Sequence, residues 1–228
     1  SDVRAAITAL PEVKEVSVHM ISMTEEERKA LFGEPKEGTA APYNHIQRVV
    51  AVMSGKGGVG KSLVTGLLAA ALRREGYQVG ILDADITGPS IPMLFGLHGL
   101  VEPGPVGIRP MLSGMGVKII SMNFLLESED QAVIWRGPLI GKAITQLWGD
   151  VMWGDLDYLL VDLPPGTSDA SLTTMQSLPV DGIIMVTTPQ SLASMVVRKA
   201  VHMAQAVNTS ILGVVENMAY FVCPDTGR

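Results

Sequence analysis

Residues 53–74 read MSGKGGVGKSLVTGLLAAALRR and carry the pattern that decides the fold. Gly55–Ser62 matches G-x-x-x-x-G-K-[ST] in full, after an apolar run that ends at Met53 and before a stretch rich in Leu and Ala. A strand before this pattern and a helix after it form the context in which it binds phosphate. A flexible glycine turn with exposed lysines is the alternative, but it accounts for neither the full match nor its context. The sequence therefore predicts a phosphate-binding loop.

Each residue type in this loop has a chemical role. Glycines let backbone N–H groups turn inward around phosphate oxygens, and the helix that follows adds the positive end of its dipole. Lys61 is predicted to neutralise the β- and γ-phosphates, and the Ser62 hydroxyl is predicted to bind Mg²⁺. The predicted ATP-binding residues of the loop are Gly55, Lys56, Gly57, Gly58, Val59, Gly60, Lys61 and Ser62.

Apolar strand candidates alternate with helical stretches from residue 46 onward. The strand candidates are 49–53, 79–82, 117–122, 158–161, 182–186 and 211–215, and the helical stretches include 62–75, 139–148 and 191–207. Continuous apolar strands joined by helices are typical of a parallel sheet that is covered by helices on both faces. The predicted fold class is therefore α/β.

Two acidic motifs end predicted strands and so fall at the carboxyl edge of the sheet. YLLVDLPPGTSD places Asp162 there, where it is predicted to hold Mg²⁺ beside the phosphates, and Gly166 could let the backbone approach the γ-phosphate. ILDADITGPS ends another strand with Asp83 and Asp85, and one of the two is predicted to orient the attacking water. An exposed acidic turn stays open as the alternative for this pair.

Composition limits the classes of function. Lys and Arg number 17 and Asp and Glu 23, so the net charge is 17 − 23 = −6, and without a long basic run this argues against broad nucleic-acid binding. No signal peptide is visible, and no apolar stretch approaches the ~18–20 residues of a membrane span. Cys223 is the single cysteine, which excludes an internal disulfide framework. We expect a cytoplasmic protein with no nucleic-acid and no membrane partner.

The chain is expected to comprise a small N-terminal unit, a linker and one large domain. Residues 1–33 read as helix, strand and capped helix, and about 30 residues are too few for a core of their own. Residues 34–45, GEPKEGTAAPYNH from Gly33 onward, have the composition of a linker. Residues 46–228 form the predicted P-loop ATPase domain. The chain begins with Ser1 and stops directly after FVCPDTGR, so we expect it to be cut at both ends, and the domain to be truncated at its C-terminus.

The segment GKGGVGKS resembles the deviant phosphate loop of the MinD/ParA/NifH group of dimerising P-loop ATPases. In that group the early lysine, matched here by Lys56, reaches across a dimer to the partner's nucleotide. The resemblance implies that Lys61 serves its own subunit's phosphates and Lys56 those of the other. It also implies that catalysis requires a closed, ATP-bound homodimer. Two positively charged loops can close together when polyanionic nucleotides lie between them.

The chain resembles one branch of that group more closely, the Mrp/ApbC-type iron–sulfur carrier proteins. The matching blocks are LDADITGPSIPMLFG, VIWRGPLIGKAITQ, DYLLVDLPPGTSD, VTTPQSLA and GVVENMAYFVCPD, which occur in order and, with the phosphate loop, cover about four fifths of the chain. By this resemblance Asp85 positions the water, Asp162 is the Mg²⁺ aspartate, Asn217 reads the adenine edge and Pro189 lines the base pocket. Residues 1–33 resemble the tail of a small iron–sulfur-assembly domain.

The cysteine motif departs from this branch. The family has C-P-x-C, with which two subunits bind a bridging [4Fe–4S] cluster, but here the stretch is Cys223-Pro224-Asp225-Thr226. A hydroxyl such as that of Thr226 is a poor substitute for a thiolate at iron. The missing ligand could lie beyond Arg228, could come from a partner, or does not exist. Cys223 could also be a small buried hydrophobic residue.

These observations lead to three functional hypotheses. The first is a homodimeric ATPase that binds a [4Fe–4S] cluster and transfers it to apo iron–sulfur proteins, together with cluster-assembly proteins. The alternative is a MinD/ParA-like switch for positioning or partitioning, which needs a basic amphipathic tail or surface that these residues lack. A NifH-like reductase would need two cluster cysteines per subunit, and the chain has one.

Overall fold

The computed structural model describes residues 38–85, 90–121, 124, 137–166, 169–189 and 195–220, with the backbone alone at 137–140, 169, 195–197 and 199–200. The chain divides into two units between Glu37 and Gly38, and all of these residues belong to the second unit. The predicted unit 1–33 lies outside the described residues, and the predicted division into domains stays a prediction.

The described strands are β1 (His45–Ser54), β2 (Val79–Asp83), β3 (Met111–Leu112), β4 (Lys118–Ser121), β5 (Asp155–Asp162), β6 (Gly182–Thr187) and β7 (Ser210–Glu216). The described helices are α3 (Lys61–Arg74), α4 (Ile91–Leu94), α5 (Gly137–Asp150), α6 (Asp169–Gln176) and α7 (Met195–Ala206), with a short 3₁₀ helix η1 (Ala41–Tyr43). Every strand and helix that the sequence analysis predicts by residue range from position 46 onward has a counterpart here. Strand β3 and helices α4 and α6 are additional.

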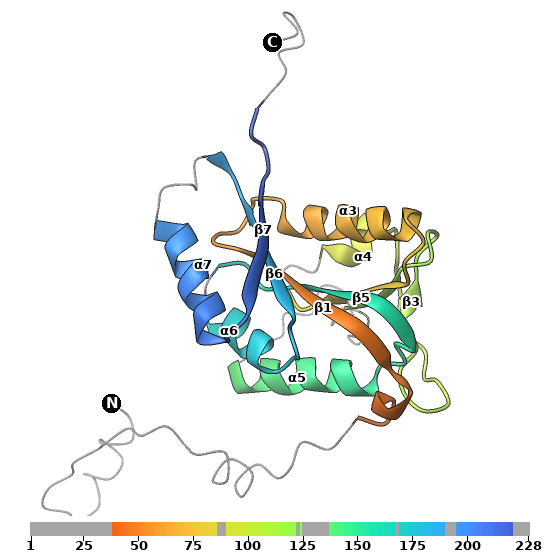
Figure 1. Ribbon diagram of the computed structural model, residues 1–228. Coiled ribbons are helices and arrows are strands. Elements are labelled where there is room, and N and C mark those ends of the chain that lie inside the picture. The colour runs from red at the N-terminus through yellow and green to blue at the C-terminus, as the bar shows by residue number, and fades with distance from the viewer. Residues whose placement is uncertain are drawn as a thin grey trace, which may run out of the picture. The chain divides into compact units, whose positions relative to one another are not determined.

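The strands form one sheet in the order β3-β4-β2-β5-β1-β6-β7. All neighbouring pairs are parallel except β3 and β4, so the predicted parallel sheet is correct apart from one short antiparallel strand at its edge. Helices α3 and α4 cover one face, and α5, α6 and α7 lie on the other (Figure 1). None of the described helices is both long and apolar enough to cross a lipid bilayer.

Strand β1 shows why the central strands read as continuous apolar runs. Successive side chains of a strand point to opposite faces. Val49, Ala51 and Met53 enter the core beneath α5, α6 and α7, whereas Val50 enters the core beneath α3 and α4. Because both faces are covered, an alternating polar pattern would bury polar groups, and the sequence has none in this run.

The sheet brings three strand ends together. Val52 of β1 pairs with Asp162 of β5, and Asp162 in turn pairs with Asp83 of β2. Parallel strands end at one edge, so the loop that follows Ser54 and the carboxyl ends of β2 and β5 meet there. Ligands of open α/β sheets bind at this edge.

Candidate phosphate-binding site

The loop between β1 and α3 has the backbone that its glycines allow. Gly58 and Gly60 have φ of +75° and +83°, which lie in the left-handed region, and a Cβ on Gly58 would meet nothing within 4 Å. The Ser54 hydroxyl donates a hydrogen bond to the Lys56 carbonyl at 2.9 Å and closes the start of the loop. Lys56 is exposed, and α3 begins at Lys61. The first N–H groups of a helix have no acceptor within it, so this loop and helix end are suited to an anion.

Lys61 and Asp162 form a buried ion pair at the base of this loop. The Lys61 Nζ lies 2.7 Å from the Asp162 Oδ2, and the two side chains are 6% and 0% exposed. The Asp85 Oδ2 lies 3.9 Å from the same Nζ. A buried charge needs a partner of opposite sign, and Lys61 has two carboxylates within reach.

Two hydroxyls of α3 also bind Asp162. The Ser62 hydroxyl donates to the Asp162 Oδ2 at 2.6 Å, and the Thr65 hydroxyl donates to the Asp162 Oδ1 at 2.7 Å. Thr65 is fully buried. The first two turns of α3 are therefore fastened to the end of β5 through one carboxylate.

Asp83 is a second buried carboxyl at this edge, in a different environment. Its Oδ1 accepts a hydrogen bond from the Asp85 N–H at 3.2 Å, and its Oδ2 has no hydrogen-bond partner. Burial, and after it the charge of Asp162, raises the pKa of Asp83 well above its ordinary value. The site thus holds one carboxylate paired with a lysine and one carboxyl that is driven toward its neutral form.

The segment after β5 returns to the phosphate loop. Gly166 has φ of +83°, and its N–H donates to the Ser54 carbonyl at 3.0 Å. The Ser171 hydroxyl is near the carbonyls of Pro164 and Gly166, at 3.0 and 3.2 Å. These contacts bring Gly166 next to the loop, as its predicted approach to a phosphate requires.

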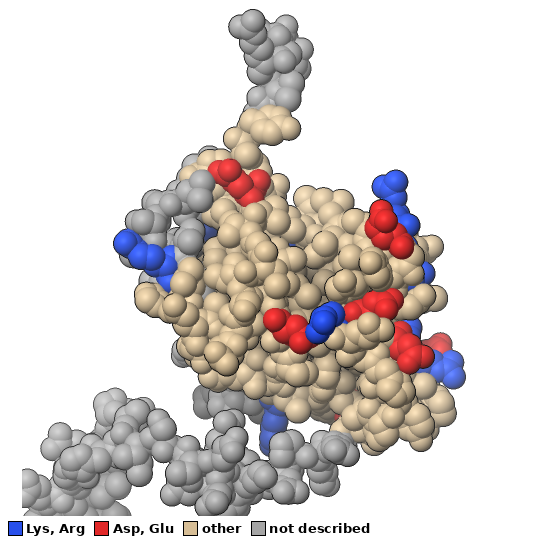
Figure 2. All heavy atoms as spheres, viewed as in Figure 1, with Lys and Arg blue, Asp and Glu red and all other residues tan. Residues whose placement is uncertain are grey.

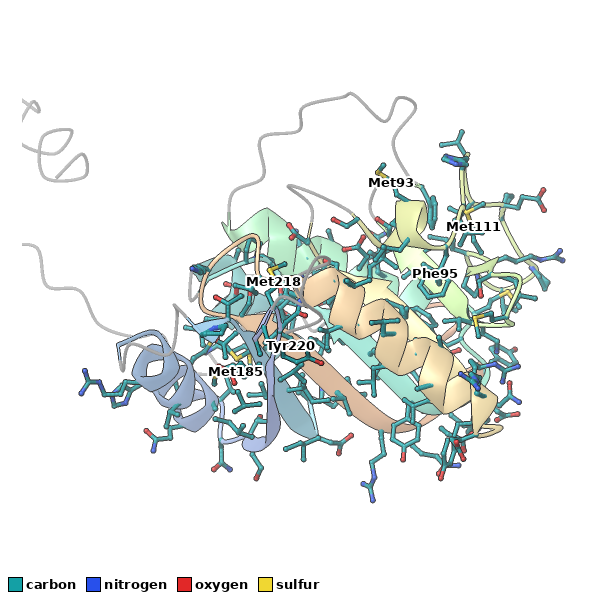
Figure 3. The ribbon with its side chains drawn as sticks, turned by 90° about the horizontal axis from the view of Figure 1, so that it is seen from above. Met93, Phe95, Met111, Met185, Met218 and Tyr220 are labelled. Atoms are coloured by element: carbon teal, nitrogen blue, oxygen red, sulfur yellow. The ribbon has the colours of Figure 1, made fainter. Side chains whose placement is uncertain are left out.

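Asn217 and Pro189 follow β7 and β6. The Asn217 N–H donates to the Thr187 carbonyl at 2.8 Å, and its side-chain Nδ2 donates to the Val59 carbonyl of the phosphate loop at 2.9 Å. Pro189 is half-buried two residues beyond Thr187. Met218, next to Asn217, lies beside the start of α3 (Figure 3), and a Cβ on Gly60 would lie 3.9 Å from its Cε.

The donor set at this edge fits Mg²⁺ together with a nucleotide. Mg²⁺ prefers oxygen ligands and is bound by one or two carboxylates plus phosphates, and a hydroxyl and a carboxylate are adjacent here in Ser62 and Asp162. In the described part of the chain no group of three or more His, Cys, Asp or Glu side chains could hold a metal ion by itself. The predicted cluster ligand Cys223, and Thr226, lie outside the described residues.

Sequence reasoning did not identify Thr65 as part of the site. Its signal is its place on α3: Thr65 lies one turn after Lys61 and three residues after Ser62, so it shares the helix face that meets Asp162. Sequence reasoning also did not decide which of Asp83 and Asp85 orients the attacking water. Two carboxyls at the end of one strand differ only in the partners that the fold brings to them.

Comparison with protein-family models gives a match over residues 45–228, to the ParA family described as NUBPL iron-transfer P-loop NTPase. An iron–sulfur cluster carrier protein of Clostridium perfringens is 51% identical over 189 residues, covering 79% of this chain and 66% of the relative. A protein of the same name from Synechocystis sp. is 43% identical and covers 98% of this chain and 62% of its own length. The chain thus spans less than two thirds of both relatives.

Two further similarities are informative. The cytosolic Fe-S cluster assembly factor CFD1 of Kluyveromyces lactis is 47% identical over 82% of this chain and 69% of its own length. A solved nucleotide-binding protein of Archaeoglobus fulgidus, in complex with ADP, is 51% identical with a TM-score of 0.72, over 80% of this chain and 71% of that one. The septum site-determining protein MinD of Pyrococcus horikoshii is 23% identical with a TM-score of 0.54, over 75% of this chain and 70% of that one, and supports the fold alone.

Proposed function

Because the chain belongs to the NUBPL-type iron-transfer family of P-loop NTPases, we propose that it hydrolyses ATP as a homodimer. We further propose that it carries an iron–sulfur cluster to apo-proteins, with cluster-assembly proteins as further partners. The cytosolic relative supports a cytoplasmic location. The observation that carries the ATPase proposal is the cluster of Lys61, Ser62 and Asp162 directly below the glycine loop.

The proposed roles follow from charge and position. Lys61 binds the β- and γ-phosphates, and backbone N–H groups of residues 57–62 surround them. Ser62 and Asp162 hold Mg²⁺, which supplies positive charge where negative charge develops on the phosphates. Asp85, whose carboxylate lies 3.9 Å from the Lys61 ammonium, orients the attacking water. Pro189 and Asn217 are proposed to contact the base.

The homodimer proposal is supported by apolar side chains that face solvent on α3 and α4. Leu63 and Leu67 lie one turn apart on α3, and Leu67 is 60% exposed. Met93 on α4, labelled in Figure 3, is 77% exposed, and the next residue, Leu94, is also exposed. Helix α4 contacts α3 near Gly66, where a Cβ would lie 3.5–3.7 Å from Phe95 and Leu94. With the exposed Lys56 in the loop before α3, these residues suit burial against a second copy.

The iron–sulfur cluster is proposed as a substrate that the protein carries, and not as a permanent cofactor. Cys223 is proposed as one ligand from each subunit, with the remaining ligands supplied by a partner protein. Charge gives little support to nucleic-acid binding: on the face shown in Figure 2 the described Lys and Arg side chains lie in small separate groups, several of them beside Asp or Glu. A positioning switch without a cluster remains the competing outcome.

Calorimetry and phosphate release test the ATPase proposal. The chain should bind Mg-ATP and release phosphate, and Lys61→Ala should abolish both while the exposed Lys142→Ala on α5 leaves both unchanged. Equal activity of Lys61→Ala and the parent chain would exclude this site. Iron and acid-labile sulfide after anaerobic reconstitution, with Cys223→Ala as the comparison, test the cargo. An ATPase that binds no iron, also in a version extended past Arg228, would favour the positioning switch.

A further inference from the structure

Asn217 ties the end of β7 to the phosphate loop, 158 residues earlier in the chain. Its backbone N–H is bound to the Thr187 carbonyl at 2.8 Å, which fixes the residue at the end of β6. Its carboxamide Nδ2 then donates to the Val59 carbonyl at 2.9 Å. Val59 is almost fully buried, so this carbonyl has little access to water as an alternative donor.

The same carboxamide packs closely against the backbone of Gly60. A Cβ built on Gly60 would overlap the Asn217 Nδ2, and the φ of +83° at Gly60 is itself unfavourable for any residue with a side chain. Met218, which follows Asn217, has φ of +54°, so the backbone turns sharply where the amide is presented. The same Nδ2 therefore both packs against Gly60 and donates to the Val59 carbonyl, and in this way it holds the Val59–Gly60 peptide.

We propose that Asn217 is a positioning residue of the phosphate loop, and this inference rests on the proposed nucleotide-binding function. A trans peptide unit is planar, so its carbonyl and its N–H point in opposite directions. By holding the Val59 carbonyl, Asn217 directs the Gly60 N–H away from itself and fixes the left-handed turn from which α3 starts. An oriented N–H binds an anion better than one that must first be ordered.

This role differs from the contact with the adenine edge that the family resemblance implies for Asn217. A residue that only reads the base affects ligands that contain a base. A residue that shapes the loop affects every ligand that binds through its phosphates. Inorganic tripolyphosphate with Mg²⁺ carries the phosphates without a base and separates the two roles.

The test compares Mg-tripolyphosphate, Mg-ATP and Mg-GTP by calorimetry for the parent chain and two variants. Asn217→Leu keeps the approximate size but removes the donor, and Asn217→Ala removes both. Asn208→Gly is the matched control, because Asn208 is exposed in the turn before β7 and its φ of +51° suits glycine. Circular dichroism checks that each variant is folded at the assay temperature.

Loss of one hydrogen bond to the loop should weaken tripolyphosphate and ATP by the same factor, about five- to tenfold. The ratio of ATP to GTP affinity should not change, and Asn208→Gly should behave as the parent chain. A variant that binds tripolyphosphate normally and ATP weakly would overturn the inference and leave a base contact. A parent chain that binds neither ligand would overturn the proposed function and this inference together.

Discussion

Asp83 and Asp162 are paired in register at the ends of the parallel strands β2 and β5, yet of the two only Asp162 forms an ion pair with Lys61. The Asp162 carboxylate lies 2.7 Å from the Lys61 ammonium, whereas the Asp83 Oδ2 has no hydrogen-bond partner. Burial, and after it the negative charge of Asp162, raises the pKa of Asp83, so Asp83 is the carboxyl that is expected to take the proton.

Asp83→Asn should stabilise the fold at neutral pH by at least about 1.4 kcal/mol, the free energy that one pKa unit represents, because an amide has no charge whose burial opposes folding. Because the pKa of Asp83 is raised in the folded chain, the folded state binds more protons than the unfolded state above pH ~4. The free energy of unfolding of the parent chain therefore falls as pH rises through the pKa of Asp83 in the folded state. The Asp83→Asn variant has no carboxyl at this position, so its stability does not fall in this way. Urea unfolding between pH 4.5 and 8 measures it.

The control for this prediction is Asp155→Asn, because the Asp155 side chain is 90% exposed. An Asp83→Asn variant whose gain in stability does not grow with pH would show that Asp83 is ionised in the folded chain.

Lys61→Ala should lower the free energy of unfolding by about 3 kcal/mol, because it leaves the buried charge of Asp162 without its cation. The double variant Lys61→Ala/Asp162→Asn should recover part of this loss, with a coupling of about 1–3 kcal/mol. Denaturant unfolding of both single variants and the double variant completes the cycle. Strict additivity would mean that the ion pair contributes no coupling.

Thr65→Val should destabilise the chain by about 1–2 kcal/mol, because a methyl group of similar size replaces a donor to the Asp162 Oδ1. Thr65→Ser keeps the hydroxyl and should remain closer to the parent chain. Thermal unfolding without nucleotide compares the three proteins. If Ser and Val have equal effects, packing of the methyl group and not the hydrogen bond explains the role of Thr65.

Leu67→Gln should weaken ATP-dependent dimerisation at least about fivefold, because a polar side chain replaces an apolar one on the surface that we propose to be buried. Analytical ultracentrifugation with a non-hydrolysable ATP analogue measures the dimer, and calorimetry should show unchanged ADP affinity. Leu112→Gln is matched, since Leu112 is equally exposed but lies on the edge strand β3. Equal dimerisation of both variants would place the interface elsewhere.

The strands were predictable because the sheet is buried on both faces. Each central strand needs an unbroken apolar run, and the runs that end in Asp83 and Asp162 placed both aspartates at the carboxyl edge. Helix α6, DASLTTMQ, was not predictable, because Ser and Thr favour caps and turns over helix interiors. In the structure the Thr174 hydroxyl bonds to the Ala170 carbonyl, and that of Ser171 lies near the Pro164 carbonyl.

The glycine loop and Lys61 were predictable because the spacing of Gly55–Ser62 matches the phosphate-binding pattern in full. The contacts that the loop makes with distant segments were not. The bond from Asn217 to Val59 leaves no trace in local sequence, because it joins residues 158 positions apart. The bond from Thr65 to Asp162 has one local signal, the spacing of Thr65 from Lys61 and Ser62 on α3, but its acceptor lies 97 positions away. Only the strand order determines which distant residues become neighbours.

Asp162 already accepts hydrogen bonds from Lys61, Ser62 and Thr65, all from two turns of one helix. The Oδ2 atom accepts from both Lys61 and Ser62, so a cation that binds this oxygen must displace one of them, and its binding there is an exchange of partners and not a simple addition. The net enthalpy of such an exchange is expected to be small. The heat of Mg²⁺ binding, measured by calorimetric titration, should then depend on what the released Lys61 ammonium and Ser62 hydroxyl bind next. The expected acceptor is a polyphosphate. The metal and the anion are thereby made thermodynamically dependent on each other.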